Sequence, residues 1–178
     1  GLRAADSGSR VLIYADGYWR NGKWIDHKGN ADVAIETAKK EGQAIDKVLV
    51  WRRYPHKTSS EAPMVLGRDF FVEDVLKDCA GQMVEPVSLD SEAPLFLMYT
   101  SGTTGKPKGC QHRTGGYLAY VTGTAKYYQD IHPGDVYWCM ADIGWITGHS
   151  YIVYGPLALG ATSVLYEGVP QFPDAARP

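Results

Sequence analysis

A loop rich in glycine, hydroxyl and lysine side chains is the strongest chemical feature of this sequence. It spans residues 99–109, reads YTSGTTGKPKG and directly follows the apolar run at 94–99. Glycine allows positive φ and a close approach of the backbone to a ligand, while hydroxyl and ammonium groups donate hydrogen bonds to phosphate oxygens. The pattern therefore predicts a polyphosphate site. The candidate phosphate-binding residues are Thr100, Ser101, Gly102, Thr103, Thr104, Gly105, Lys106 and Lys108.

The spacing of this loop differs from that of a Walker motif. A Walker motif has four residues between its two glycines and a Ser or Thr after its lysine. Here two residues separate Gly102 from Gly105, and Pro107 follows Lys106. A P-loop kinase or GTPase is therefore disfavoured. A surface turn without function is the simpler alternative, but such a turn does not require this order of residues directly behind a buried strand.

Composition places the chain among globular proteins. Its 178 residues suffice for one compact domain, and a net charge of −2 provides no long-range attraction to nucleic acid or to an anionic membrane. No apolar run is long enough to span a membrane, and the first residues lack a signal peptide and an initiator methionine. We therefore expect a cytoplasmic protein, present here as a segment of a longer chain.

The three cysteines match no zinc or redox motif. Their odd number argues against a disulfide framework and favours a reducing compartment. We expect Cys79, Cys110 and Cys139 to be small core or near-core residues rather than nucleophiles. The sequence contains no recognisable set of protein ligands for a metal ion.

Short apolar runs alternate with helical patterns along the chain. Strands are predicted at 11–15, 47–51, 94–99, 136–140 and 161–166, and helices at 31–41, 69–79, 115–129 and 141–160. Asn30 is the predicted N-cap of the first helix, and a kink is expected at Pro156. This order predicts an α/β fold with a mainly parallel sheet and helices on both faces. Ligands of such sheets bind beyond the C-terminal ends of the strands, where the 99–109 loop lies.

Two stretches resemble one enzyme superfamily. YTSGTTGKPKG is similar to the phosphate-binding motif of acyl-adenylate-forming (ANL) enzymes, and residues 137–173 resemble the AMP-forming acetyl-CoA synthetase family in particular. The likeness runs from Ala15 to the end. It implies that acetate attacks ATP to give acetyl-AMP and pyrophosphate, after which the CoA thiol displaces AMP. Lys106 and Lys108 would then be catalytic by neutralising phosphate charge, together with Mg²⁺.

The resemblance also implies an acyl pocket. Trp145, Ile146 and Thr147 would belong to it, with Ile146 limiting its volume and Thr147 near the passage used by CoA. The alternative is that Trp145 and Ile146 are core residues at a helix start. A hydrolase pair of His149 and Ser150 is disfavoured, because neighbouring residues on a helix point in different directions.

A cationic turn is the third site that the resemblance implies. The family has a loop reading approximately Val-Arg-Gly-Gly-Arg that holds the nucleotide end of CoA. Here Arg20, Asn21, Gly22 and Lys23 occupy that place, so that a lysine point charge replaces the arginine fork. Gln171 stands where the family often has a CoA-contacting Asn. Without the family, this turn reads as a solvated hairpin.

The likeness further implies that residues 1–178 form a segment of the large N-terminal AMP-binding domain. The family's adenine-pocket motif and its C-terminal domain, with a catalytic lysine, would lie beyond Pro178. We therefore expect the segment to be inactive by itself. Acetate, ATP, CoA and the remainder of the polypeptide are the expected partners. A synthetase that prefers propionate, and a non-catalytic nucleotide-binding module, are the alternatives.

Overall fold

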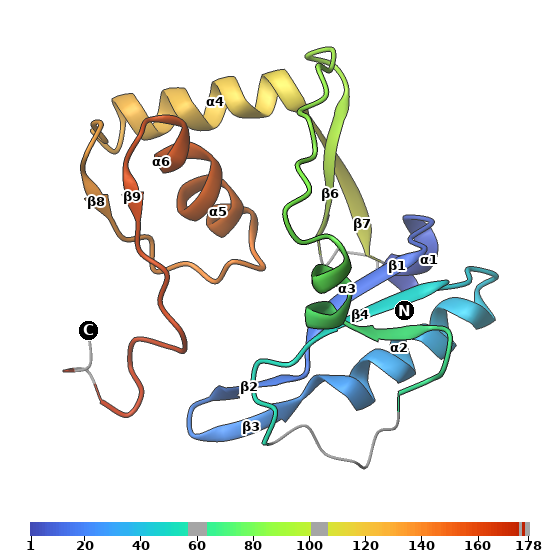
Figure 1. The fold of residues 1–178 in the computed structure, drawn as a ribbon. Helices are drawn as coiled ribbons and strands as arrows, with labels where there is room; N and C mark the ends of the chain where they lie inside the picture. Colours follow the sequence, from blue (N-terminus) through green and yellow to red (C-terminus); the bar gives the residue numbers. More distant parts are fainter. Residues whose placement is uncertain (57–63, 101–106, 175, 177–178) are drawn as a thin grey trace. The chain divides into compact units, whose positions relative to one another are not determined.

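The computed structural model describes residues 1–56, 64–100, 107–174 and 176 of the chain (Figure 1). These residues form two compact units instead of the single unit expected from chain length. The first unit contains residues 1–56, 64–86, 107–109, 171–174 and 176, and the second contains residues 87–100 and 110–170.

A parallel sheet is the centre of the first unit. Strand β4 (Lys47–Trp51) lies between β1 (Val11–Ala15) and β5 (Asp69–Phe71), and both pairings are parallel. The helices of this unit are α1 (Leu2–Asp6), α2 (His27–Lys40) and α3 (Val72–Asp78). The α/β class and the strands at 11–15 and 47–51 are thus confirmed. The helix predicted from residue 69 begins only at Val72, because the three preceding residues pair with β4.

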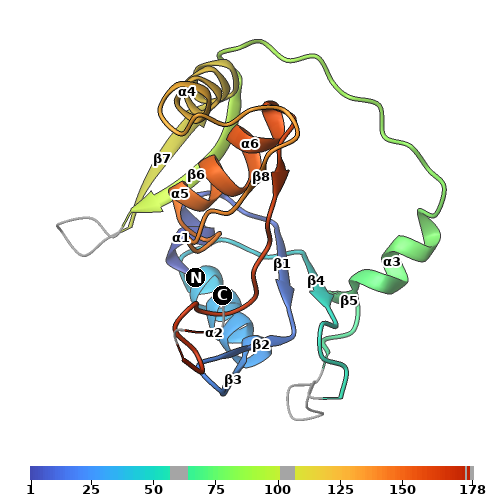
Figure 2. The ribbon, with the colours of Figure 1, turned by 90° about the vertical axis from the view of Figure 1, so that its left-hand side faces the viewer.

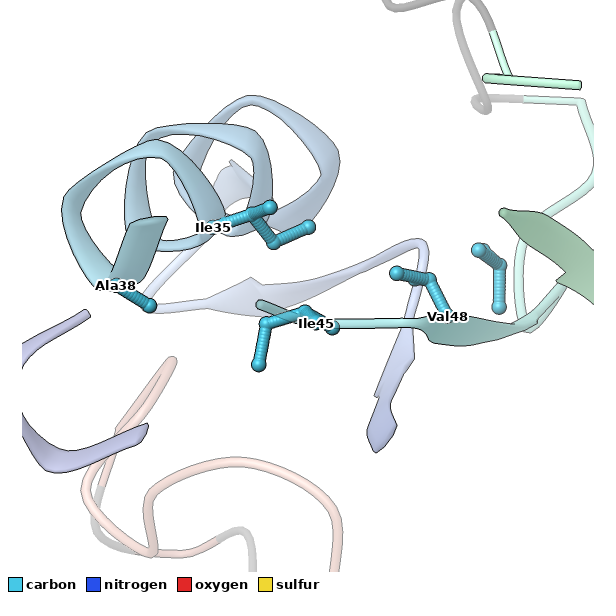
Figure 3. Close-up of a cluster of buried hydrophobic side chains, with 5 residues drawn as sticks. Ile35, Ala38, Ile45 and Val48 are labelled. Carbon is cyan, nitrogen blue, oxygen red and sulfur yellow. The ribbon is translucent and has the colours of Figure 1, made fainter. Parts of the chain in front are cut away.

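Helix α2 covers this sheet with an apolar stripe. Ile35 and Ala38 from α2 pack against Ile45, Val48 and Val50 to form the main core cluster (Figure 3). The helix begins at His27, and Asp26 rather than the predicted Asn30 is its N-cap, since the Asp26 carboxylate accepts a hydrogen bond from the Lys28 N–H at 3.0 Å. Lys28, Ala31, Ile35 and Ala38 form the buried face of the helix, whereas Val33 is 69% exposed.

Two short strands form a hairpin between β1 and α2. Strands β2 (Gly17–Arg20) and β3 (Lys23–Asp26) are antiparallel, and the two residues between them have positive φ, 50° at Asn21 and 71° at Gly22. A type I′ turn requires this combination, as the Asn-Gly pair predicts. The hairpin packs tightly at its base, because a Cβ on Gly17 would overlap the Trp24 ring and lie 2.6 Å from the Ile25 carbonyl oxygen.

The second unit contains two separate strand pairs and a helical layer (Figure 2). Strand β6 (Pro94–Thr100) pairs with β7 (Lys108–Arg113), and β8 (Val136–Tyr137) pairs in parallel with β9 (Thr162–Ser163). The helices are α4 (Thr114–Tyr127), α5 (Ile146–Gly148), η1 (His149–Tyr154) and α6 (Gly155–Ala158). Three predictions are corrected here. Strand β7 was not expected, β8 and β9 are shorter than predicted, and β6 is only half-buried.

The C-terminal helix differs from its prediction in a specific way. It starts at Ile146 rather than at residue 141, and it contains a π-helical turn, η1 (His149–Tyr154), shortly before Pro156. The Gly155 N–H donates to the Ser150 carbonyl, five residues back. Pro156 has no N–H with which to restore the α-helical pattern, so it follows the wide turn directly. A Cβ on Gly155 would lie 3.1 Å from Ala125 Cβ, which shows how closely α6 approaches α4.

The cysteines correct another expectation. Cys79 and Cys110 are exposed and Cys139 is half-buried, so the first two are not core residues of this chain. None of the helices in the described ranges is both long enough and apolar enough to cross a membrane.

An ionic cluster is buried beside α2. Lys28 Nζ lies 2.6 Å from Asp32 Oδ2 and 3.2 Å from Asp69 Oδ2, and Arg68 also pairs with both carboxylates. Burial alone would raise the pKa of Asp69, but hydrogen bonds from Arg68, a backbone N–H and Lys28 lower it to about 2. Burial and the nearby Asp69 charge raise the pKa of Tyr14, so its buried hydroxyl stays protonated.

We expect this cluster to make stability dependent on acidity. The pKa of Asp69 is lowered from 3.8 to about 2, so its carboxylate stabilises the native state above pH 4 and loses that effect as the pH falls toward 2. In the purified protein, Asp69→Asn should reduce the free energy of unfolding near neutral pH, and this difference should shrink by about 2 kcal/mol on acidification. Denaturant titrations at several pH values measure it.

Asp46→Asn is the matched control. Asp46 pairs with Arg10 at the surface, where the Arg10 side chain is 74% exposed, so its loss should cost little at any pH. Equal pH dependence of the two variants would contradict the assignment.

Candidate functional site

Only the two ends of the predicted phosphate-binding segment lie within the described residues. Residues 101–106 fall outside them, whereas Thr100 ends β6 and Lys108 begins β7, and both are exposed. Strands β6 and β7 pair with each other in one sheet. The segment is thus preceded by a strand, as predicted, and is followed by a second strand rather than directly by a helix.

The predicted acyl-pocket residues lie at the start of α5. Trp145 is the N-cap, and Ile146 and Thr147 are the first two helical residues. Trp145 is 70% exposed and Thr147 is exposed, while Ile146 is half-buried. The alternative that Trp145 is a core residue is therefore wrong for the described chain. Trp145 and Thr147 are thus displayed at a helix end, whereas Ile146 is partly packed.

Backbone contacts hold this helix end in place. The Trp145 N–H donates to the Asp142 carbonyl at 3.1 Å, and the Gly144 N–H donates to the Asp142 carboxylate at 2.8 Å. A Cβ on Gly148 would lie 2.5 Å from the Asp142 carbonyl oxygen and 2.6 Å from Ile143 Cα. Since these are backbone atoms, residue 148 must be glycine for the 142–145 loop to close on the helix.

The cationic turn lies in the first unit together with Gln171. Arg20 and Lys23 pair across the hairpin, and both are exposed. A Cβ on Gly22 would lie 2.9 Å from the Phe172 ring, so the tip of the turn contacts the residue after Gln171. The structure thereby brings together two stretches that are far apart in the sequence and that the family resemblance had assigned to one ligand.

Asp16 is a residue that the sequence analysis missed. It is 2% exposed at the end of β1, and one carboxylate oxygen accepts from the N–H groups of Gly17 and Arg53 at 2.9 and 3.0 Å. The other oxygen accepts from the Tyr54 N–H at 3.1 Å. Asp16 thus joins the ends of β1 and β4 to the base of the hairpin. The local sequence does not reveal this role, because two of the donors come from a distant part of the chain.

An aromatic cluster in the second unit was also missed. We define it as Phe96, His112, Tyr117, His149 and Tyr154. The Phe96 ring centroid lies 4.8 Å from that of His112, 5.0 Å from that of Tyr117 and 5.4 Å from that of His149. These residues come from β6, β7, α4 and η1, so the cluster joins all four elements. No local sequence pattern indicates such a contact.

Arg52, directly after β4, contacts an aromatic ring and an acidic side chain. Its guanidinium lies 4.1 Å from the centroid of the Phe71 ring, and its Nε lies 3.6 Å from the Glu73 carboxylate. In the part of the chain that is described, no group of three His, Cys, Asp or Glu side chains is placed to hold a metal ion.

An α/β fold with a glycine- and lysine-rich segment between the paired strands β6 and β7 is the combination that the family resemblance implies. The chain belongs to the AMP-binding enzyme family, whose model matches residues 2–178. Among individual proteins, the acetyl-coenzyme A synthetase of Rhizobium rhizogenes is 51% identical to it over 181 residues, and those of Bartonella quintana and Xanthobacter autotrophicus are 48% identical over 179. The alignments cover 98–99% of this chain and 26% of each relative. The chain therefore spans about a quarter of the length of these proteins, and the resemblance inferred from its motifs is confirmed.

We expect Gly148→Ala to loosen the helix end that carries Trp145. The added methyl group collides with backbone atoms of residues 142 and 143, so the variant should lose about 1–3 kcal/mol of stability. Gly123→Ala is a matched control within α4, because no atom lies within 4 Å of its added Cβ. It should be neutral or stabilising by up to about 1 kcal/mol. Thermal unfolding of both variants measures the difference, and equal midpoints would contradict the close contact.

Proposed function

We propose that this chain is a segment of the N-terminal AMP-binding domain of an AMP-forming acetate–CoA ligase. The observation that carries the proposal is 48–51% identity, over almost the whole chain, to proteins named acetyl-coenzyme A synthetase. In the first step, an acetate oxygen attacks the α-phosphorus of ATP and pyrophosphate leaves. In the second step, the CoA sulfur attacks the acetyl carbonyl carbon, AMP leaves and the thiol proton is released.

The first step joins two anions, so charge neutralisation and positioning are the main tasks of the protein. Lys106, Lys108 and the backbone N–H groups of the 100–105 segment would bind the β- and γ-phosphates. Lys108 and Thr100 are exposed at the two ends of this segment, as a phosphate-binding role requires. Mg²⁺ bound together with ATP would supply further positive charge.

The remaining two sites serve the acyl group and CoA. Trp145, Ile146 and Thr147 would form one wall of the acyl pocket. Trp145 and Thr147 are exposed and Ile146 is half-buried, so all three retain surface that a ligand could contact. Arg20 and Lys23 would bind the phosphates of CoA, with Asn21 and Gly22 shaping the turn and Gln171 nearby. Positive φ at both turn residues keeps the two cations on neighbouring strands.

The first test uses the full-length protein. Acetate-dependent exchange of pyrophosphate into ATP should be robust, and Lys108→Ala should reduce it about 100-fold by removing a phosphate contact. Lys126→Ala removes an exposed lysine from the last turn of α4 and should have no effect. The 178-residue chain alone should show no exchange. Binding of Mg-ATP by the full-length protein without exchange would instead indicate a non-catalytic nucleotide-binding module.

Ile146 provides a test of substrate size. If it limits the pocket, Ile146→Ala in the full-length protein should raise kcat/KM for propionate relative to acetate by about 10- to 100-fold, since the removed carbons are worth roughly 1–3 kcal/mol. Ile146→Val should give a smaller shift in the same direction. A wild-type enzyme that already prefers propionate would favour the alternative of a synthetase for a larger short-chain acid.

The cationic turn can be separated from the first step, because pyrophosphate exchange does not need CoA. We expect Arg20→Ala and Lys23→Ala each to raise the KM for CoA about tenfold and to leave exchange unchanged. Lys39→Ala, in the last turn of α2, is a surface control. Loss of exchange in the turn variants would assign the turn a different role.

A further inference from the structure

The Trp145 carbonyl oxygen accepts two hydrogen bonds from one residue. The His149 backbone N–H donates to it at 3.1 Å, and His149 Nδ1 lies 3.0 Å from the same oxygen. A carbonyl oxygen only accepts, so Nδ1 carries the proton in this contact. The first bond is the ordinary helical one, whereas the second is an addition that depends on the histidine side chain.

This helix end has little stability of its own. Helix α5 has only three residues, and η1 then changes the hydrogen-bonding pattern from four residues back to five. So short an α-helical turn is not held by backbone bonds alone. The hydrogen bond from the His149 side chain therefore stabilises a helix end that has few backbone hydrogen bonds of its own.

The His149 ring is itself held in position. Its centroid lies 5.4 Å from that of Phe96, which also contacts Tyr117 at 5.0 Å. One residue further along, the buried Ser150 hydroxyl forms a 2.9 Å hydrogen bond with the buried Tyr117 hydroxyl. Packing against Phe96 thus fixes the direction from which Nδ1 approaches the Trp145 carbonyl, whereas the Ser150–Tyr117 bond joins the helical segment to α4.

Fixing this carbonyl fixes two side chains. It belongs to the peptide plane between Trp145 and Ile146, so its direction sets ψ of Trp145, which is 156°, and φ of Ile146. These torsions determine how the Cα–Cβ bonds of the two residues are oriented relative to each other. Both belong to the acyl pocket of the proposed function.

On that proposed function, we infer that His149 is a positioning residue, which orients Trp145 and Ile146 toward the acyl group by hydrogen bonding to the Trp145 carbonyl. His149 does not contact the reacting atoms in this role. The pocket would remain open without the bond, but the Trp145 and Ile146 side chains that line it would adopt several orientations. Affinity for the small acyl substrate should suffer, while ATP binding should not.

The experiment uses two variants that separate the donor from the ring, in the full-length protein. His149→Phe keeps an aromatic ring on Phe96 and loses the donor, whereas His149→Asn loses the ring and keeps an N–H near the position of Nδ1. We expect His149→Phe to raise the KM for acetate about tenfold in pyrophosphate exchange, with the KM for ATP unchanged, and His149→Asn to restore most of the affinity.

Tyr117→Phe is the structural control. It removes the hydroxyl that bonds Ser150 and so should lower the thermal midpoint, but it leaves the Trp145 bond and the KM for acetate unchanged. The inference is overturned if His149→Phe and His149→Asn raise the KM equally, if neither raises it, or if Tyr117→Phe raises it as much. Should His149→Phe fail to fold, His149→Ala takes its place in the same comparison.

A second readout does not depend on activity. With fluorinated tryptophan, the Trp145 resonance, assigned from Trp145→Phe, should shift or broaden in His149→Phe and remain as in wild type in His149→Asn. If the wild-type protein fails to activate acetate, the proposed function is wrong, yet this resonance still tests the positioning. An unchanged Trp145 resonance in His149→Phe would overturn the inference.

Discussion

The buried carboxylate of Asp16 is the interaction on which the first unit depends. It lies where β1 ends, and it accepts hydrogen bonds from backbone N–H groups of Gly17, Arg53 and Tyr54. A buried charge is tolerated only when it is well hydrogen-bonded, and in return it holds its donors firmly. The exit of β4 and the start of the hairpin are therefore fixed to one point. Asp16 therefore helps to position the exposed cations Arg20 and Lys23 at the tip of that hairpin without itself having to contact a ligand.

In the second unit, buried uncharged residues position the exposed residues at a helix end. The C-terminal helical segment has a buried face made of Ser150, Ile152, Gly155 and Pro156. This face contacts α4, where Tyr117 bonds Ser150 and Ala125 lies next to Gly155. Because these residues carry the packing, Trp145 and Thr147 at the preceding helix end are left exposed. In both units, buried and hydrogen-bonded residues determine the geometry, and most of the described candidate binding residues lie exposed at or near the ends of elements.

What the sequence predicted well were features set by neighbouring residues. The apolar runs gave β1 and β4 their correct bounds, and the Asn-Gly pair gave the turn with positive φ. Features set by distant residues were missed. Asp69 to Phe71 become a strand only because β4 is beside them, since their local pattern suits a helix. Lys28 occupies a position on the buried stripe of α2, four residues from Asp32, and its burial is explained by the carboxylate of Asp69.

The same distinction applies to the candidate sites. Motifs such as 99–109 and 145–147 are continuous in sequence, so residue order alone indicates their chemistry. Asp16 and His149 act through hydrogen bonds to backbone groups. Nearly all residue types carry the same backbone N–H and carbonyl groups, so the sequence does not show which of them take part in such bonds. A histidine next to a serine therefore suggests a hydrolase pair when only residue types are read. The geometry gives the two residues separate partners, the Trp145 carbonyl for His149 and the Tyr117 hydroxyl for Ser150, so that each stabilises a different contact of the same helical turn.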